Sequence, residues 1–164
     1  MKRFFFFFTS LLVFAFIGCS DSCKKSSDNQ TASVNNSCDT SLWKYIYHRN
    51  RLQMIKPCFS AIGTIEVIRK EKDGDYHILL KLDAGQDSLL NEKNIEKQKG
   101  DLVLEPICVN KVTQEDAIDA CKNCPLTVQV PPVHSHVKVT GSYIKDNQHG
   151  WMEIHPVTKI EIVQ

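Results

Sequence analysis

The chain has 164 residues, a formal net charge of +1 and seven cysteines. That length corresponds to one domain once an export signal is removed. Charge is unevenly distributed: residues 58–164 carry 12 Lys or Arg against 16 Asp or Glu, whereas residues 20–57 carry 6 against 3. A domain that binds nucleic-acid backbone usually shows a positive footprint. The acidic balance of the longer segment therefore counts against nucleic acid as the main partner.

The N-terminus has the pattern of a lipoprotein signal peptide. Lys2 and Arg3 precede an apolar run over residues 4–17, which is shorter than the roughly 20 residues that a transmembrane helix needs and suits a signal peptide. The run ends in Phe-Ile-Gly-Cys, which resembles a lipobox, so we expect cleavage after residue 18 and lipidation of Cys19. The alternative is ordinary secretion, with Cys19 as one more disulfide cysteine. The polar residues 20–22 favour a lipid-anchored tether.

The domain organisation follows from composition. Residues 1–18 are expected to be the signal peptide, residues 19–41 a flexible polar tether, and residues 42–164 a soluble domain, because the first apolar cluster begins at Leu42. Burial of acyl chains anchors such a protein to the lipid bilayer. The expected location is the bacterial cell envelope. Ser20 after the lipidated cysteine favours the outer membrane over the inner membrane.

From residue 51 onward, apolar residues recur mostly with the period of two that is typical of strands. Strands are predicted at 51–68, 75–82, 101–109, 137–144 and 154–163. Asp73-Gly74 suits a hairpin turn, residues 88–100 read as a loop that could include a helical turn, and the capping-box-like Thr113-x-x-Asp116 predicts a short helix over 113–121. This order predicts a mainly β fold: a five-stranded, OB-fold-like Greek-key barrel with one short helix between strands 3 and 4. A small α+β sandwich is the alternative.

Six cysteines remain after Cys19 is assigned to the lipid, and six cysteines allow 15 pairings. The disulfide candidates in the domain are Cys58, Cys108, Cys121 and Cys124. We predict a Cys108–Cys121 bridge. Cys108 lies near the end of the predicted third strand and Cys121 at the end of the helix that follows it, so the two cysteines are expected to be close. The Cys121-Lys122-Asn123-Cys124 segment follows that helix, where the helix dipole disfavours a thiolate. A structural disulfide is therefore favoured over redox catalysis, with zinc bound by Cys108, Cys121 and Cys124 as a weaker alternative.

Five of the six histidines lie in three short motifs. Residues two apart in a strand share a face, so Asp75 with His77, and Glu153 with His155, are each expected to point to one side. Three such motifs at strand ends could converge on one mouth of a barrel and bind zinc or transfer protons. The candidate metal- or ligand-binding residues are Asp75, His77, His136, His149, Glu153 and His155. The plainer alternative for each is a solvated strand end.

Four segments carry a resemblance to a known family. They are Asp-Gly-Asp-Tyr-His at 73–77, Gly-Asp-Leu-Val-Leu-Glu at 100–105, His-Val-Lys-Val-Thr-Gly-Ser-Tyr at 136–143 and His-Gly-Trp-Met-Glu-Ile-His-Pro-Val at 149–157. Together they resemble an uncharacterised, often exported prokaryotic family with a DGDxH … VTGxY … HGWxEIHPV signature. The resemblance covers about residues 52–162 and implies a compact β-rich domain without an assigned activity.

A weaker similarity is to staphylococcal nuclease, an OB-fold family in which an Asp-Gly-Asp segment also opens the second strand. That family binds calcium through such carboxylates and uses an arginine supplied by the following segment. Here no arginine follows Asp75; beyond Arg3, the arginines are Arg49, Arg51 and Arg69. The sequence order therefore counts against nuclease chemistry of that type.

Three functions remain open. The favoured one is a non-enzymatic binding or interaction module for a protein or small-molecule ligand, because the sequence has no nucleophile motif, phosphate loop or complete metal-ligand spacing. The alternative is a metal-dependent, nuclease-like hydrolase that uses the Asp, His and Glu cluster, with zinc as the possible cofactor. A purely structural envelope protein is the third.

Overall fold

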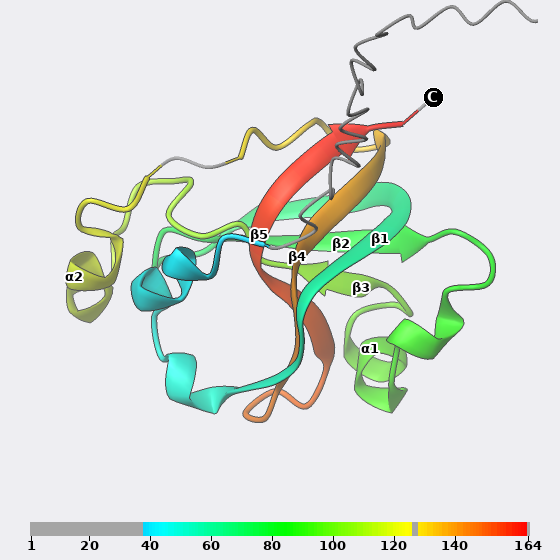
Figure 1. Cartoon of the computed structure of the whole chain (residues 1–164), viewed down its shortest axis with the longest axis horizontal. Coiled ribbons are helices and arrows are strands. Elements are labelled where there is room, and N and C mark those ends of the chain that lie inside the picture. Colours follow the sequence, from blue (N-terminus) through cyan, green and yellow to red (C-terminus); the bar gives the residue numbers. More distant parts are fainter. Residues whose placement is uncertain (1–37, 126–127, 164) are drawn as a thin grey trace, which may run out of the picture. The chain divides into compact units, whose positions relative to one another are not determined.

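The computed structural model describes residues 38–125 and 128–163. Five strands form the sheet: β1 (Leu52–Lys70), β2 (Tyr76–Leu82), β3 (Leu102–Leu104), β4 (His136–Asp146) and β5 (Met152–Ile162). The α-helices are α1 (Glu92–Lys97) and α2 (Ile118–Cys121). Short 3-10 turns lie at η1 (Thr40–Tyr45), η2 (Arg49–Arg51), η3 (Asp87–Leu89) and η4 (Glu115–Ala117). Figure 1 shows these helical turns around the margins of a strongly curved sheet.

The strands are hydrogen-bonded in the order β1-β2-β3-β5-β4, and β4 pairs back with β1, so the sheet closes on itself. The β3–β5 pair is parallel and all other pairs are antiparallel. The prediction of a mainly β domain with five strands and few helices is confirmed.

The long first strand belongs to two pairings. Its N-terminal half pairs with β4 and its C-terminal half with β2, and Gly63 has partners on both sides. A Cβ atom at residue 63 would lie 2.2 Å from the carbonyl oxygen of Lys81. Glycine is therefore required here, because the two backbones approach too closely for a side chain. The predicted turn at Asp73-Gly74 is also present, with Gly74 at φ +102°.

Two predicted elements differ in extent. The third strand ends at Leu104 rather than at residue 109, and Cys108, at φ 55°, lies in the loop that follows. The segment predicted as a loop at 88–100 contains α1, because the Asn91 side chain caps its first turn by accepting from the backbone N–H groups of Lys93 and Asn94. The helix predicted at 113–121 is present as η4 followed by α2.

One apolar core fills the closed sheet and a second, smaller cluster lies beneath η1. The main core includes Ile65, Ile78, Leu104, Val139 and Ile154. The smaller cluster centres on Leu42, Ile46 and Ile107. A Cys38–Cys58 disulfide connects the segment before η1 to β1, so the folded part already includes residues 38–41, which the sequence assigned to the tether.

Candidate functional site

A single row of side chains crosses four strands of the sheet. Arg69 on β1 pairs with His77 on β2. Ile78 pairs with Leu104 across β2 and β3, which places His77 beside Glu105. Leu104 pairs with Ile154 across β3 and β5, which places Glu105 beside His155. Residues that are directly opposite on neighbouring strands are close enough to interact, so register alone aligns the four polar groups.

The row lies on the face of the sheet that does not contribute to the main core. Ile78, Leu104 and Ile154 all belong to that core, and side chains one residue away point to the opposite face. The expected convergence at a barrel mouth is therefore wrong for these residues, because alternation along β2, β3 and β5 directs them outward. They are nevertheless buried, and His155 is only 1% exposed.

Glu105 connects the two histidines of the row. Its Oε1 lies 3.3 Å from Nδ1 of His77 and its Oε2 lies 2.9 Å from Nδ1 of His155. The same Nδ1 of His155 is 3.1 Å from Oε1 of Glu153. Nε1 of Trp151 donates to Oε2 of Glu153 at 2.7 Å, and Nε2 of His77 lies 3.1 Å from Oε1 of Gln98. The result is a continuous buried network of two histidines and two glutamates.

The contacts within the network shift the pKa values of its two glutamates in opposite directions. Burial by itself raises the pKa of Glu105, but the charge and hydrogen bond of His155 hold it below its ordinary value. Burial by itself lowers the pKa of His155, but the two glutamates raise it well above its ordinary value. Burial, together with the charge of Glu105, raises the pKa of Glu153. The principal ion pair of the network is therefore Glu105 with His155.

Asp75 lies next to this network, two residues before His77. Its Oδ1 accepts a hydrogen bond from the backbone N–H of Cys108 at 2.8 Å. Burial raises the pKa of Asp75 to about 7, despite the opposing effect of His155. One ligand atom each from Asp75, Glu105 and His155 lies within 4.8 Å of the other two.

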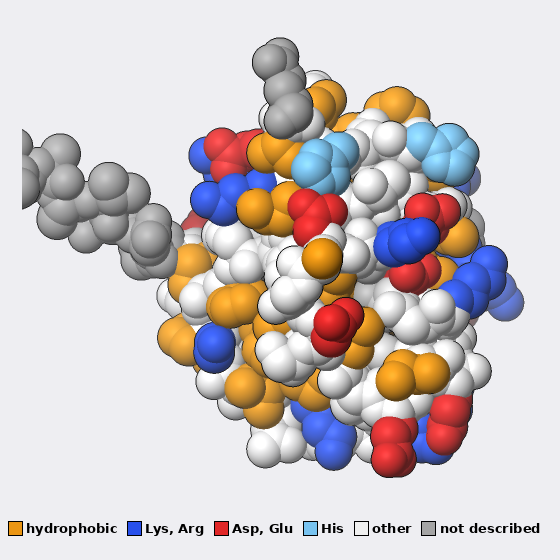
Figure 2. Space-filling model, turned by 90° about the vertical axis from the view of Figure 1, so that its right-hand side faces the viewer, with side chains coloured by type: hydrophobic (Ala, Val, Ile, Leu, Met, Phe, Trp, Pro, Cys, Tyr) orange, Lys and Arg blue, Asp and Glu red, His pale blue; other side chains and the backbone are white. Residues whose placement is uncertain are grey.

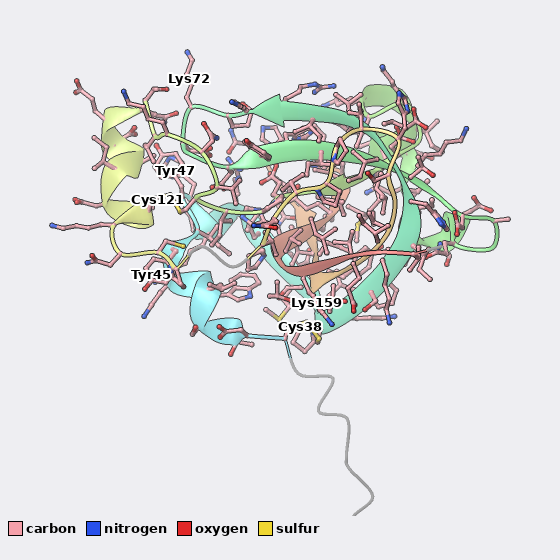
Figure 3. The ribbon with its side chains drawn as sticks, turned by 90° about the horizontal axis from the view of Figure 1, so that it is seen from above. Cys38, Tyr45, Tyr47, Lys72, Cys121 and Lys159 are labelled. Carbon is pink, nitrogen blue, oxygen red and sulfur yellow. A yellow bond between two sulfur atoms is a disulfide. The ribbon has the colours of Figure 1, made fainter. Side chains whose placement is uncertain are left out.

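A cavity of about 360 Å³ opens over the row. Its lining includes Arg51, Arg69, Asp75, His77, Glu105 and Trp151. Lys72 also lines it, but this side chain extends outward from the turn between β1 and β2 (Figure 3). The cavity thus has buried acid and imidazole groups at its base and basic side chains at its edge.

The sequence-predicted residues divide into three groups. Asp75, His77, Glu153 and His155 come together in one cluster, as described above. His149 lies at the cavity wall, stacked on Trp151 with ring centroids 4.4 Å apart, and its Nδ1 is 2.7 Å from Asp146. His136 is not part of the site.

His136 pairs with Asp83, with Nε2 2.9 Å from Oδ2, and the two side chains are 41% and 46% exposed. Asp83 follows the C-terminal end of β2, whereas His77 lies near the N-terminal end of that strand. His136 is therefore at the other end of the sheet from the cluster. It does not join the other candidate histidines.

Sequence reasoning missed Glu105 and Gln98. Glu105 ends the apolar segment Leu102–Leu104, and a buried acid placed directly after a buried strand was the signal available. Gln98 follows α1 and carries no comparable signal.

The sequence argument against nuclease chemistry was that no arginine follows Asp75. The folded domain nevertheless brings two arginines to the site. Arg51 and Arg69 precede Asp75 in the chain but line the same cavity. Arg69 reaches it because β1 lies beside β2 in the closed sheet, and Arg51 lies in η2, where it pairs with Asp146.

The predicted Cys108–Cys121 disulfide is present. Cys58 is also disulfide-bonded, to Cys38. Cys124 has no disulfide partner among the described residues, so neither a bridge nor a three-cysteine zinc site involving it is formed there. Cys121 lies at the end of α2, on the same side of the domain as Tyr47 (Figure 3).

Figure 2 shows acidic and basic side chains interspersed over the described part of the face that bears α1, without a broad basic area among those residues. In the same described ranges, no helix is both long and apolar enough to cross a membrane.

Searches of protein-family models, curated proteins and solved structures found no match to this chain.

Asp75→Asn is expected to reduce the pH dependence of stability in metal-free protein. The folded-state pKa of Asp75 is about 7 against an ordinary value of 3.8, so its contribution is complete below about pH 4 and is lost as pH rises to about 7. Asparagine cannot ionise. Urea unfolding at pH 4.5 and 7.5 in EDTA should show the variant gaining stability relative to wild type at the higher pH. An unchanged difference between the two pH values would contradict the assignment.

Proposed function

We propose that this chain is a lipid-anchored envelope lipoprotein whose domain is an OB-fold-like Greek-key barrel acting as a binding module. The cavity above the His–Glu row is its ligand site. The strand order β1-β2-β3-β5-β4 with a parallel β3–β5 pair supports the OB-fold-like assignment, as does the helical segment between β3 and β4. Ligand pockets of this kind combine a concave surface with a few convergent polar groups.

One observation carries the proposal: four ionisable side chains form a buried network under an open cavity. These are His77, Glu105, Glu153 and His155, each less than 10% exposed. Removing charges from water costs several kcal/mol per ion, and apolar replacements of buried ion pairs are often neutral or stabilising by about 1–4 kcal/mol. A cluster that does not improve stability is best explained by binding.

Native mass spectrometry of the full-length protein, extracted from membranes in mild detergent, tests ligand binding. We expect a non-covalent mass in addition to polypeptide and lipid. Trp151→Leu, which alters the cavity wall, should reduce that adduct, whereas Lys159→Ala, an exposed change elsewhere on β5, should not. Wild-type protein that carries no adduct, or an adduct equal in all three proteins, would contradict a ligand site in this cavity.

Cys19→Ser tests the anchor. Cys19 and the tether up to residue 37 lie outside the described residues, so this proposal rests on the signal-peptide pattern. The variant is expected to lose incorporation of radiolabelled palmitate and to move from the membrane fraction to the soluble fraction, because acyl chains provide the membrane affinity. Cys124→Ser is the matched control and should keep both properties. Unchanged palmitate labelling in Cys19→Ser would refute lipidation at this residue.

A metal-dependent hydrolase is the second candidate, and one observation favours it. Arg51 and Arg69 line the same cavity as Asp75 and Glu105, and a guanidinium can stabilise charge that develops on a phosphoryl group. Hydrolysis of bis(p-nitrophenyl) phosphate by wild type, lost in Arg69→Ala, would establish this function over simple binding.

A further inference from the structure

His155 has one ring nitrogen without a partner. Its Nδ1 lies within 3.1 Å of both Glu105 and Glu153, whereas its Nε2 is buried and has no hydrogen-bond partner. A buried polar atom without a partner costs free energy and requires an explanation. Metal binding would displace the proton of Nε2, so that Nδ1–H stays directed at the glutamates and Nε2 presents a lone pair to the ion. That is the state in which a histidine ligates a metal ion.

Two carboxylates lie next to this imidazole. Asp75, Glu105 and His155 each offer a ligand atom within 4.8 Å of the others, and all three residues are buried. Two ligands that share one zinc ion at about 2.1 Å are separated by roughly 3.5 Å in tetrahedral geometry. To ligate an ion on Nε2, the Glu105 carboxylate would move away from Nδ1 of His155, and Glu153 would remain as the partner of Nδ1. Asp75 and Glu105 also line the cavity, so a fourth position would be accessible to water or to a ligand.

The neighbours of the triad resemble the outer shell of a metal site. Metal-ligating histidines usually donate their other N–H to a carboxylate that is itself hydrogen-bonded. Glu153 is in that position: its Oε1 lies 3.1 Å from Nδ1 of His155, and its Oε2 accepts from Nε1 of Trp151. The indole thereby fixes the glutamate, and the glutamate fixes the imidazole.

We infer that Asp75, Glu105 and Nε2 of His155 form a binding site for one divalent transition-metal ion of the zinc class. An imidazole nitrogen combined with two carboxylates suits zinc and similar ions better than magnesium or calcium, which prefer oxygen ligands only. The inference rests on the proposed function, since it assigns the chemical class of one ligand of the same cavity. Glu153 is a positioning residue of this site.

Zinc titration of the full-length, EDTA-treated protein in detergent, followed by isothermal calorimetry, tests the inference. Wild type should bind one equivalent of zinc. Asp75→Asn and His155→Gln should each weaken binding by tenfold or more, and Glu153→Gln, which removes the outer carboxylate, by about 10–100-fold. His136→Gln is the matched control, because His136 pairs with Asp83 outside the cavity, and it should bind zinc as wild type does.

Cobalt(II) gives a second readout that does not depend on His155→Gln folding. A cobalt-loaded wild-type protein should show the intense visible absorption bands of a four-coordinate ion, and Asp75→Asn should lose them while keeping the wild-type circular dichroism spectrum. Failure of wild type to bind stoichiometric zinc, or equal binding by Asp75→Asn, would overturn the metal site. An organic adduct that depends on Trp151 in protein that binds no zinc would overturn the metal inference alone and leave the binding module intact.

Discussion

Glu105→Gln is expected to lower the free energy of unfolding by about 3–5 kcal/mol, the usual cost of removing one partner from a buried ion pair. The carboxylate of Glu105 contacts Nδ1 of both His77 and His155. Glutamine keeps the shape but removes the charge, so the charged form of His155 loses its principal partner. Urea denaturation at pH 7 in EDTA measures the loss directly.

Two controls make this result interpretable. Glu153→Gln changes an equally buried glutamate in the same network, but the pKa of Glu153 is raised. Its charge therefore contributes less to the folded state, and the expected loss is smaller than for Glu105→Gln. Glu161→Gln changes an exposed glutamate paired with Lys159 and should leave the free energy of unfolding close to that of wild type, because exposed ion pairs contribute little. Equal losses in Glu105→Gln and Glu153→Gln would refute the assignment of Glu105–His155 as the principal ion pair.

Removing the Cys108–Cys121 disulfide is expected to cost about 3 kcal/mol, the value for a closed loop of about 15 residues. The sequence separation here is 13 residues. The bridge also holds the loop after β3 against the site, because the backbone N–H of Cys108 donates to Asp75. The double variant Cys108→Ala/Cys121→Ala should therefore unfold at lower urea concentration and show a weaker adduct in native mass spectrometry.

Cys124→Ala is the control for this variant, since Cys124 has no disulfide partner among the described residues. It should change the unfolding free energy by less than the double variant. A double variant as stable as wild type would show that the bridge does not constrain the unfolded chain. Loss of stability with an unchanged adduct would show that the loop keeps its position without the bridge.

Much of the strand content was predictable because it depends on local pattern. The alternation through Tyr76, Ile78, Leu80 and Leu82 identified β2, and Asp73-Gly74 identified the turn before it. Local capping was harder to read. The Asn91 and Asn94 side chains form a reciprocal cap around the first turn of α1, but asparagine is equally common in loops, so the segment was expected to be a loop with one helical turn as a possibility.

The candidate site was only partly predictable. Asp75 with His77, and Glu153 with His155, were found because strand period places residues two apart on one face. The sequence could not show which face that was, so the barrel-mouth expectation was wrong. It also gave no means of separating His136, which begins β4 and pairs with Asp83, from the histidines that meet. The histidine motifs are similar in sequence, and only the strand register shows which histidines are neighbours in the sheet.

The sequence by itself determined the features that depend on near neighbours along the chain: the five strands and the placement of Asp75 with His77 on one face. Only the tertiary structure decided which distant residues share the row. Glu105 meets both His77 and His155 because β3 lies between β2 and β5, and Arg69 joins them from β1. Strand order and register are long-range properties that no local pattern encodes, and they place the glutamate between the two histidines.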